Sequence, residues 1–271
     1  MTLASQRITL VAAVLMVATL AFGLVIPKVA GVGFLALAAL ALSWLTLNRA
    51  WRHGHLMSLE RLFVVFVSVF VAIWLMAWFW HGLSSAGQDA LGRMLRLLLI
   101  IPIFLFVRRA DRLDQAWWLG LILGGWITGL FAWWFFLTGQ TATYEQRVEG
   151  ATNPIYFGGI ALAMAVMLLP KLMEHRRAWW HRVAVGGAIV MAFSASLFSG
   201  SRGAWLALIP LLILYTQTLG RRHSIRWRVG LPVVAAVCAI AILLTPSVPT
   251  SERFVEGFSE LQQLLQGDIT D

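Results

Sequence analysis

The chain has 271 residues, of which 60% are hydrophobic and 12% are charged, and its mean hydropathy is +0.80. This charged fraction is about half that of an ordinary soluble domain. Because water does not solvate a surface with so few charges, the composition excludes a soluble enzyme, a disordered chain and a fibrous repeat. The net charge of +9 comes from short basic clusters between long apolar runs. This is loop charge of a membrane protein and predicts no binding to nucleic acid.

Apolar runs of membrane-spanning length recur along the chain. A bilayer core about 30 Å thick is crossed by roughly 20 helical residues. The runs predict an all-α polytopic membrane protein in which residues 1–246 form the transmembrane domain and residues 247–271 begin a loop on the outer side. The nine predicted spans are residues 8–26, 29–47, 62–80, 91–107, 116–137, 154–170, 183–199, 204–219 and 230–244.

The distribution of basic residues predicts the orientation. Of the 21 Lys and Arg residues, 15 fall on the same side as Arg7 when the predicted spans alternate in direction. Cytoplasmic segments carry an excess of Lys and Arg, so the amino terminus is predicted to be cytoplasmic and the carboxyl terminus to lie outside. The six basic residues on the outer side are Lys28, Arg93, Arg96, Arg147, Arg202 and Arg253.

The middle third of each predicted span lacks Asp, Glu, Lys, Arg and His. Ion-coupled transporters usually need such residues at the membrane midplane, so coupled transport is disfavoured, whereas an uncoupled flippase is not excluded. The sequence also lacks a P-loop, an HExxH helix and Cys/His clusters with metal-ligand spacing. No cofactor or metal is therefore predicted.

Arg93 and Arg96 are the first outer arginines of interest. Only eleven residues separate Arg96 from Arg108, which is about 16 Å of helix, so a span of full thickness must take in Arg96 and extend towards Arg93. The two arginines, three residues apart, share one helix face near the outer boundary. The alternative interpretation is that both side chains reach lipid headgroups.

Two further arginines lie in outer connections. Arg147 precedes Asn153-Pro154, which opens the sixth predicted span, and it is flanked by Glu145 and Glu149. The alternative to a ligand-binding role is that Arg147 is a solvated loop charge paired with either glutamate.

The second of these, Arg202, lies in the short connection between the seventh and eighth predicted spans. Serine and glycine around it, next to a helix amino terminus, have the composition of an anion-binding nest; a tight turn with an arginine reaching the surface is the alternative. The four outer arginines at positions 93, 96, 147 and 202 are predicted to lie at one depth. Together they suit a lipid diphosphate, because each guanidinium group can bind two phosphate oxygens at once. The connection consists of Ser199, Gly200, Ser201, Arg202 and Gly203.

The stretch SGSRGAWLA at residues 199–207, together with RVEGATNPIYFG at residues 147–158, resembles the O-antigen ligase family. That family belongs to a larger group that includes O-antigen polymerases and protein O-oligosaccharyltransferases. The first stretch is the more specific match, and together with the alternation of spans the resemblance covers most of the chain.

The resemblance implies an inverting, metal-independent glycosyltransferase of the bacterial inner membrane, with its active face in the periplasm. Such an enzyme moves a glycan from undecaprenyl diphosphate to lipid A-core, in contact with membrane lipids, and Arg147 and Arg202 match the positions that hold the diphosphate. O-antigen polymerase activity is the nearest alternative function. The alternative from a different class is a non-enzymatic flippase or binding protein for the lipid-linked glycan.

Family members continue into a large outer loop that supplies a further arginine and a histidine implied as general base. Here no histidine follows His223, and Phe254, Phe258, Leu261 and Leu265 form an apolar stripe typical of the first amphipathic helix of that loop. The sequence therefore predicts an amino-terminal portion of a ligase that binds donor without transferring glycan.

Three weaker candidates for a base lie within the chain. His81 is the sole histidine on the predicted outer face, where its neighbours are typical of an interfacial helix end. Glu145 and Glu149 flank Arg147, whose charge favours their ionised form.

Overall fold

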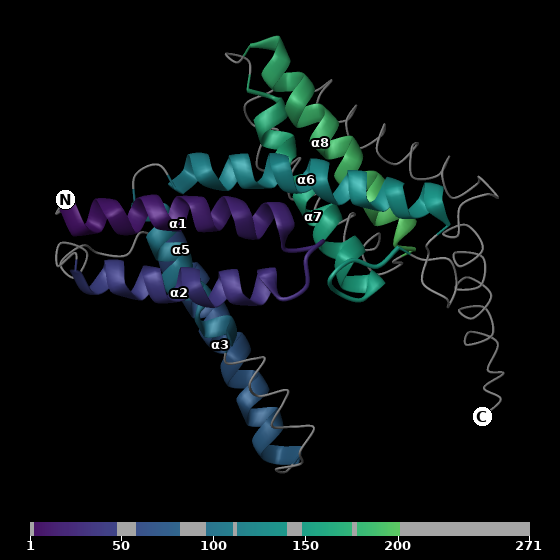
Figure 1. Cartoon of the computed structure of the whole chain (residues 1–271). Coiled ribbons are helices and arrows are strands. Elements are labelled where there is room, and N and C mark those ends of the chain that lie inside the picture. The colour runs from purple at the N-terminus through teal and green to yellow at the C-terminus, as the bar shows by residue number, and fades with distance from the viewer. Residues whose placement is uncertain are drawn as a thin grey trace, which may run out of the picture. The chain divides into compact units, whose positions relative to one another are not determined.

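The computed structural model describes residues 3–47, 58–81, 96–110, 113–139, 148–174 and 178–200. Within these ranges the chain is helical and contains no strand (Figure 1). Five of the helices, α1, α2, α6, α7 and α8, are long and apolar enough to cross a membrane. The helices are α1 (Leu3–Phe22), α2 (Val29–Leu47), α3 (Ser58–His81), α5 (Ile100–Arg109), α6 (Leu113–Thr138), α7 (Pro154–Leu172) and α8 (Trp179–Phe198).

The first seven predicted spans each overlap a described helix, and residues 91–95 of the fourth lie outside the described residues. Helix α2 has the predicted bounds, whereas α1 begins and ends four to five residues earlier than the predicted span 8–26. The end of α1 is displaced because residues 23–28 form a turn that contains Pro27, which donates no backbone hydrogen bond. The predicted spans 204–219 and 230–244 and the predicted loop 247–271 lie outside the described residues.

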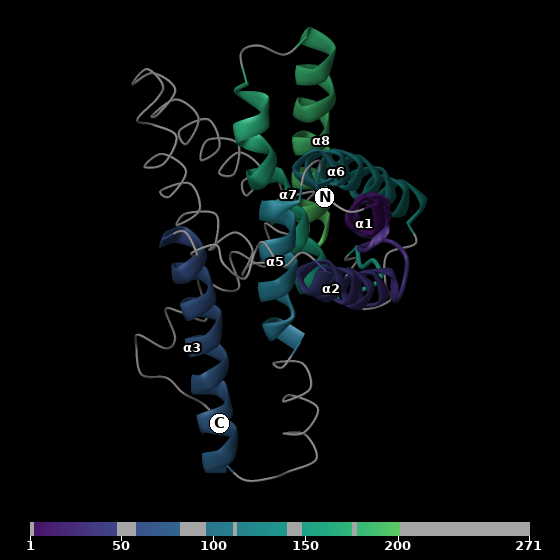
Figure 2. The ribbon, with the colours of Figure 1, turned by 90° about the vertical axis from the view of Figure 1, so that its left-hand side faces the viewer.

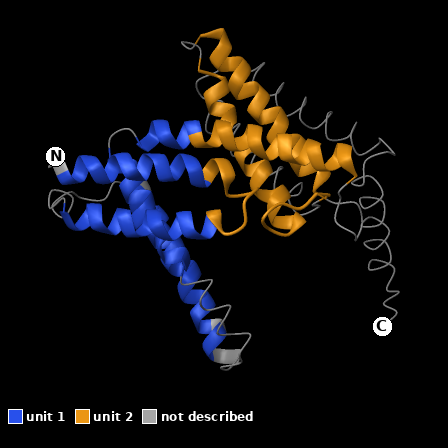
Figure 3. Cartoon of the chain, in the orientation of Figure 1, with its two compact units in different colours: residues 1–19, 30–119 blue, residues 20–29, 120–271 orange. Residues whose placement is uncertain are grey.

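The chain divides into two compact units (Figure 3). Unit 1 comprises the described residues within Met1–Thr19 and Ala30–Leu119, and unit 2 comprises those within Leu20–Val29 and Gly120–Asp271. Each unit therefore combines segments that are distant in sequence. The apolar pattern alone predicts a single transmembrane domain, because it does not report which helices pack together.

In unit 1, α1 and α2 lie side by side (Figures 1 and 2). Gly33 of α2 lies against the Thr19 side chain, whose hydroxyl donates a hydrogen bond of 2.7 Å to the Leu15 carbonyl of its own helix. A Cβ atom at position 33 would overlap Thr19, so glycine is what permits this approach. The carboxyl-terminal part of α2 packs on α5 through Trp44 and Phe106, whose ring centroids are 5.2 Å apart.

The contact between α3 and α5 combines aromatic rings with a buried ion pair. Phe63 and Phe104 have centroids 4.1 Å apart, and Arg109 Nη2 lies 2.7 Å from Glu60 Oε2. Arg109 Nε also donates to Glu60 Oε1 at 3.4 Å, so the guanidinium binds both carboxylate oxygens. The Glu60 side chain is only 3% exposed. Because residue numbers fall along α5 as they rise along α3, the two helices are antiparallel.

Unit 2 is built around α6, α7 and α8. A Cβ atom built at Gly125 would lie 2.7 Å from Ala188 O, and one built at Gly129 would lie 2.6 Å from Met191 O, so the α6 and α8 backbones are in close contact. The paired residue numbers rise together, and the two helices therefore run in the same sense.

Helix α7 runs in the opposite sense to α6. A Cβ atom at Gly124 would lie 3.3 Å from Met164 Cε, and Phe131 pairs with Phe157 at a centroid distance of 6.2 Å. Three consecutive helices that alternate in direction are what successive membrane crossings require.

Candidate functional site

Two predicted site residues lie at the carboxyl-terminal end of α8, whereas Arg96 is the one predicted site arginine among the described residues. The structure describes Ser199, Gly200, Arg96, Glu149 and the backbone of His81. The remaining predicted site residues lie outside the described residues; they are Arg93, Glu145, Arg147, Ser201, Arg202 and Gly203.

The end of α8 is closed by its own backbone. Ser199 N donates to Ala195 O at 3.1 Å, Gly200 N donates to Leu197 O at 3.0 Å, and Gly200 has a positive φ of 61°. A glycine in the left-handed region is a common way to end a helix. The expectation that serine and glycine N–H groups are free to bind an anion is therefore wrong for these two residues, because helix termination already uses them.

The Ser199 side chain is also committed to α8. Its hydroxyl donates to the Ser196 carbonyl at 2.7 Å, and the residue is fully buried. The described hydrogen bonds of Ser199 and Gly200 therefore close the last turn of α8.

The segment that follows Arg147 is held against this same turn. Val148 N donates to Phe198 O, the last carbonyl of α8, at 3.0 Å, and the Val148 side chain is 1% exposed. Three residues later, Ala151 N donates to Leu24 O in the turn between α1 and α2 at 2.8 Å. Residues 148–151 therefore bridge the end of α8 and the turn 23–28, all within unit 2.

Gly150 makes this bridge possible. A Cβ atom at this position would overlap the Leu24 carbonyl oxygen and would lie 2.8 Å from a ring carbon of Phe157. The backbone at residue 150 therefore passes closer to its neighbours than any other amino acid allows. The adjacent Glu149 is exposed, so its carboxylate faces away from the buried side of the segment.

The start of α7 is capped as its sequence predicts. Asn153 Oδ1 accepts a hydrogen bond of 3.0 Å from Tyr156 N, and Pro154 occupies the first helical position. Asparagine at the N-cap and proline immediately after it are both favoured at helix starts. The prediction that Asn153-Pro154 opens this helix is confirmed, and the cap fixes the far end of the 148–153 segment.

Aromatic side chains of α6 cover the last turn of α8. The Phe136 and Phe198 rings stack with an interplanar angle of 13° and a centroid distance of 4.5 Å, and Trp133 meets Phe198 edge-on at 5.0 Å. Trp133 Nε1 donates to Ser194 Oγ at 3.1 Å, and that hydroxyl donates to Met191 O at 2.8 Å. The sequence gives no sign of this hydrogen bond between Trp133 and Ser194, which lie 61 positions apart.

Arg96 and His81 belong to unit 1. Arg96 is exposed and lies in a helical stretch, interrupted by a turn at Leu99, that continues into α5. That a membrane span takes in Arg96 stays a prediction. His81 is the last residue of α3. The diphosphate-binding role of Arg96 and the role of His81 as a base stay predictions.

No group of three or more His, Cys, Asp and Glu side chains among the described residues is arranged to hold a metal ion. Comparison of the chain with protein-family models, curated proteins and solved structures finds no match. The functional assignment therefore depends on the residues of the chain and on the geometry of unit 2.

Proposed function

We propose that the protein is an O-antigen ligase-like glycosyltransferase of the bacterial inner membrane. It transfers a glycan from undecaprenyl diphosphate to lipid A-core at the periplasmic face, and Arg147 and Arg202 bind the donor diphosphate. The observation that carries the proposal is the hydrogen bond from Val148 N to Phe198 O. It joins the two segments that the resemblance singles out.

Chain connectivity extends this observation to the arginines. Arg147 is bonded directly to Val148, so its Cα lies about 3.8 Å from that of Val148. Arg202 follows Gly200 by two residues, which limits the separation of their Cα atoms to about 7 Å. Both arginines are therefore close in sequence to the residues joined by the bond from Val148 N to Phe198 O, which supports joint recognition of one diphosphate.

The proposed reaction is a displacement at the anomeric carbon of the donor sugar. The hydroxyl oxygen of the acceptor sugar attacks this carbon, and the bond to the diphosphate oxygen breaks with its electron pair. The anomeric configuration is inverted, and the hydroxyl proton passes to a base. Negative charge grows on the departing diphosphate, and guanidinium groups that strengthen their bonds to it at this stage lower the barrier.

Three residues of the chain are candidates for the base. Glu149 is exposed and two residues from Arg147, which places it among the candidates, together with Glu145 and His81. General-base catalysis typically raises a reaction rate by about 10²- to 10⁴-fold. The size of the loss in transfer rate after substitution, and its pH dependence, therefore distinguish the base from the arginines.

Deletion of the gene in its host bacterium tests the function. A ligase predicts polymer that accumulates on the undecaprenyl carrier and is absent from lipid A-core. Single repeat units on lipid A-core identify a polymerase instead. Unchanged glycosidic linkages together with loss of carrier movement across the membrane identify a flippase and contradict the proposed transfer.

Arg202→Lys, introduced into the gene in its host bacterium, is expected to reduce transfer at least tenfold while the protein level is unchanged. Lysine keeps the charge but loses the planar fork that binds two phosphate oxygens, and a tenfold loss corresponds to about 1.4 kcal/mol. The rate at which polymer appears on lipid A-core measures the effect. Transfer at the wild-type rate contradicts a diphosphate-binding role for Arg202.

The proposal includes nine membrane spans with a cytoplasmic amino terminus and a periplasmic carboxyl terminus. The alternating directions of α6, α7 and α8 support it. Single cysteines introduced at Thr143 and Gly267 are expected to react with an impermeant thiol reagent added from outside, whereas one at Arg177 is not. Mass-tag labelling of intact cells measures this. Protection of both outer positions contradicts the orientation.

A further inference from the structure

Two neighbouring tryptophans in the first turn of α8, Trp179 and Trp180, form a tryptophan pair with mostly exposed side chains. Trp179 is 76% exposed and Trp180 is 62% exposed. Trp180 meets the His181 ring edge-on at a centroid distance of 5.9 Å, and neither indole N–H of the pair has a hydrogen-bond partner among the described residues. Packing within the described part of the chain therefore does not account for the tryptophan pair.

Two tryptophans of α6, in contrast, satisfy their indole groups inside unit 2. Trp126 Nε1 donates to Ala184 O at 3.0 Å, and Trp133 Nε1 donates to Ser194 Oγ at 3.1 Å. An indole N–H without an acceptor is costly in hydrocarbon, because nothing there replaces its hydrogen bond to water. The tryptophan pair therefore needs an acceptor outside the described residues, while its large apolar rings disfavour bulk water.

The length of α8 places the tryptophan pair at a membrane boundary. The helix comprises 20 residues, Trp179–Phe198, and is therefore about 30 Å long, which equals the thickness of the hydrocarbon core. Its exposed side chains farther along are apolar, since Val183 is 60% exposed and Val190 is 65% exposed. A helix that crosses the core over its whole length begins where hydrocarbon meets the lipid headgroups, here four residues before the predicted span 183–199.

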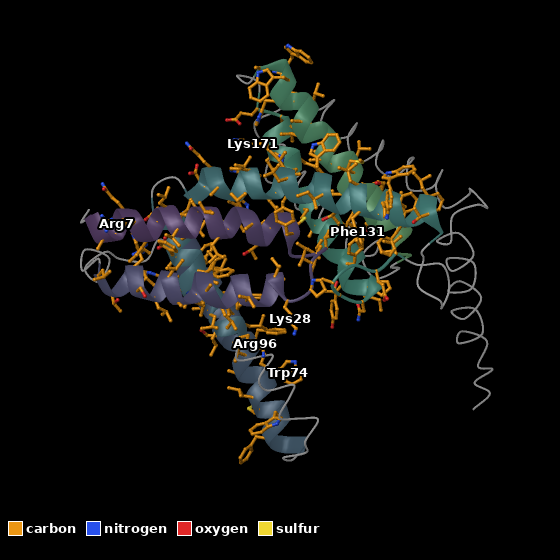
Figure 4. The ribbon with its side chains drawn as sticks, viewed as in Figure 1. Arg7, Lys28, Trp74, Arg96, Phe131 and Lys171 are labelled. Carbon is orange, nitrogen blue, oxygen red and sulfur yellow. The ribbon has the colours of Figure 1, made fainter. Side chains whose placement is uncertain are left out.

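Charged side chains lie at the same end of unit 2. The end of α7 and the start of α8 are joined by the short connection 173–178 and lie close together (Figures 1 and 4). Lys171 forms its ion pair with Glu174 at this end of α7, and the exposed Arg182 follows Trp179 by three residues. Basic side chains beside exposed tryptophans are typical of the headgroup level of a membrane span.

We infer that Trp179 and Trp180 form a membrane anchor whose partner is the headgroup region of a glycerophospholipid bilayer. The rings lie at the edge of the hydrocarbon, and the indole N–H groups donate to ester carbonyl and phosphate oxygens of the lipids. This contact fixes the depth of α8 in the membrane. The inference requires that α8 crosses the membrane, and it is independent of the proposed glycan transfer.

The test is the depth of a nitroxide probe in the 271-residue protein, reconstituted into vesicles of phosphatidylethanolamine and phosphatidylglycerol. Ala178 is exposed and directly precedes the tryptophan pair, so Ala178→Cys carries the probe in a chain with Cys238→Ser. The accessibility of the probe to oxygen, relative to a water-soluble nickel complex, measures its depth, and the probe is expected at headgroup level. Trp179→Ala/Trp180→Ala is expected to move it towards water by about 4.5 Å, the rise of three residues, because Arg182 then marks the boundary.

The matched control is Val183→Ala/Val190→Ala. This variant shortens two comparably exposed side chains of the same helix, and it is expected to leave the probe depth unchanged because both positions face hydrocarbon. The tryptophan variant is expected to keep the wild-type thermal unfolding midpoint, since the side chains that it removes are exposed. A change of depth in that variant then does not arise from unfolding.

An unchanged probe depth in Trp179→Ala/Trp180→Ala overturns the inference. A wild-type probe that is as accessible to nickel as a probe in bulk water also overturns it. Vesicles of phosphatidylcholine alone are expected to give the same wild-type depth, because this lipid offers the same carbonyl and phosphate oxygens. A probe that reaches headgroup level only with phosphatidylglycerol identifies attraction between basic side chains and anionic lipid as the anchor and contradicts the role of the tryptophan pair.

Discussion

Glu60→Gln is expected to lower the free energy of unfolding by about 3 kcal/mol. The substitution leaves the Arg109 guanidinium beside a neutral group in the contact between α3 and α5, where the carboxylate now binds it through both oxygens. An uncompensated charge in a buried pair is strongly unfavourable, and the 19% exposure of the Arg109 side chain places the effect at the lower end of the usual range. Unfolding of the purified protein by SDS titration in mixed micelles measures it.

Two variants test whether burial is the cause. The Lys171 and Glu174 side chains form an ion pair of 2.8 Å in which Glu174 is 42% exposed, so Glu174→Gln is expected to change stability by less than about 1 kcal/mol. The double variant Glu60→Leu/Arg109→Met removes both charges and is expected to recover most of the loss. Equal effects of Glu60→Gln and Glu174→Gln are incompatible with a buried-pair explanation.

The sequence predicts the helices well and their packing poorly. Long apolar runs predict the position of α2 and the Asn153-Pro154 start of α7, because span length and helix capping are local properties. The pairing of Glu60 with Arg109 is not predictable in this way, since the two residues are 49 positions apart and each falls among the ordinary charges of the predicted cytoplasmic side. The same holds for the division into two units.

The candidate site shows a similar limit. Sequence reasoning singles out residues 147 and 199–203 through their residue types, but it predicts free N–H groups at Ser199 and Gly200 that helix termination uses instead. It does not predict that Leu24 accepts a hydrogen bond from Ala151, because a backbone contact between distant segments leaves no side-chain signature. A partial signal is Gly150, whose lack of a side chain permits the close approach.

The contact between α6 and α8 is expected to tolerate no added carbon at Gly129. A Cβ atom there would lie 2.6 Å from the carbonyl oxygen and 2.7 Å from the carbonyl carbon of Met191. These are backbone atoms of the facing helix, so the two helices have to separate, and overpacking of this kind typically costs about 1–3 kcal/mol. Gly129→Ala is therefore expected to lower the free energy of unfolding by roughly 2 kcal/mol or more. The thermal unfolding midpoint of the purified protein in detergent measures this loss.

Gly159 in α7 provides the matched control, since a Cβ atom at that position meets nothing within 4 Å. Both substitutions replace glycine by alanine inside a helix and gain the same propensity, up to about 1 kcal/mol. The difference between the two variants therefore isolates the steric term. Gly159→Ala is expected to be neutral or stabilising. Gly129→Ala with equal stability would show that α6 and α8 are farther apart than the described contact, and the shared direction inferred for them would lose its main support.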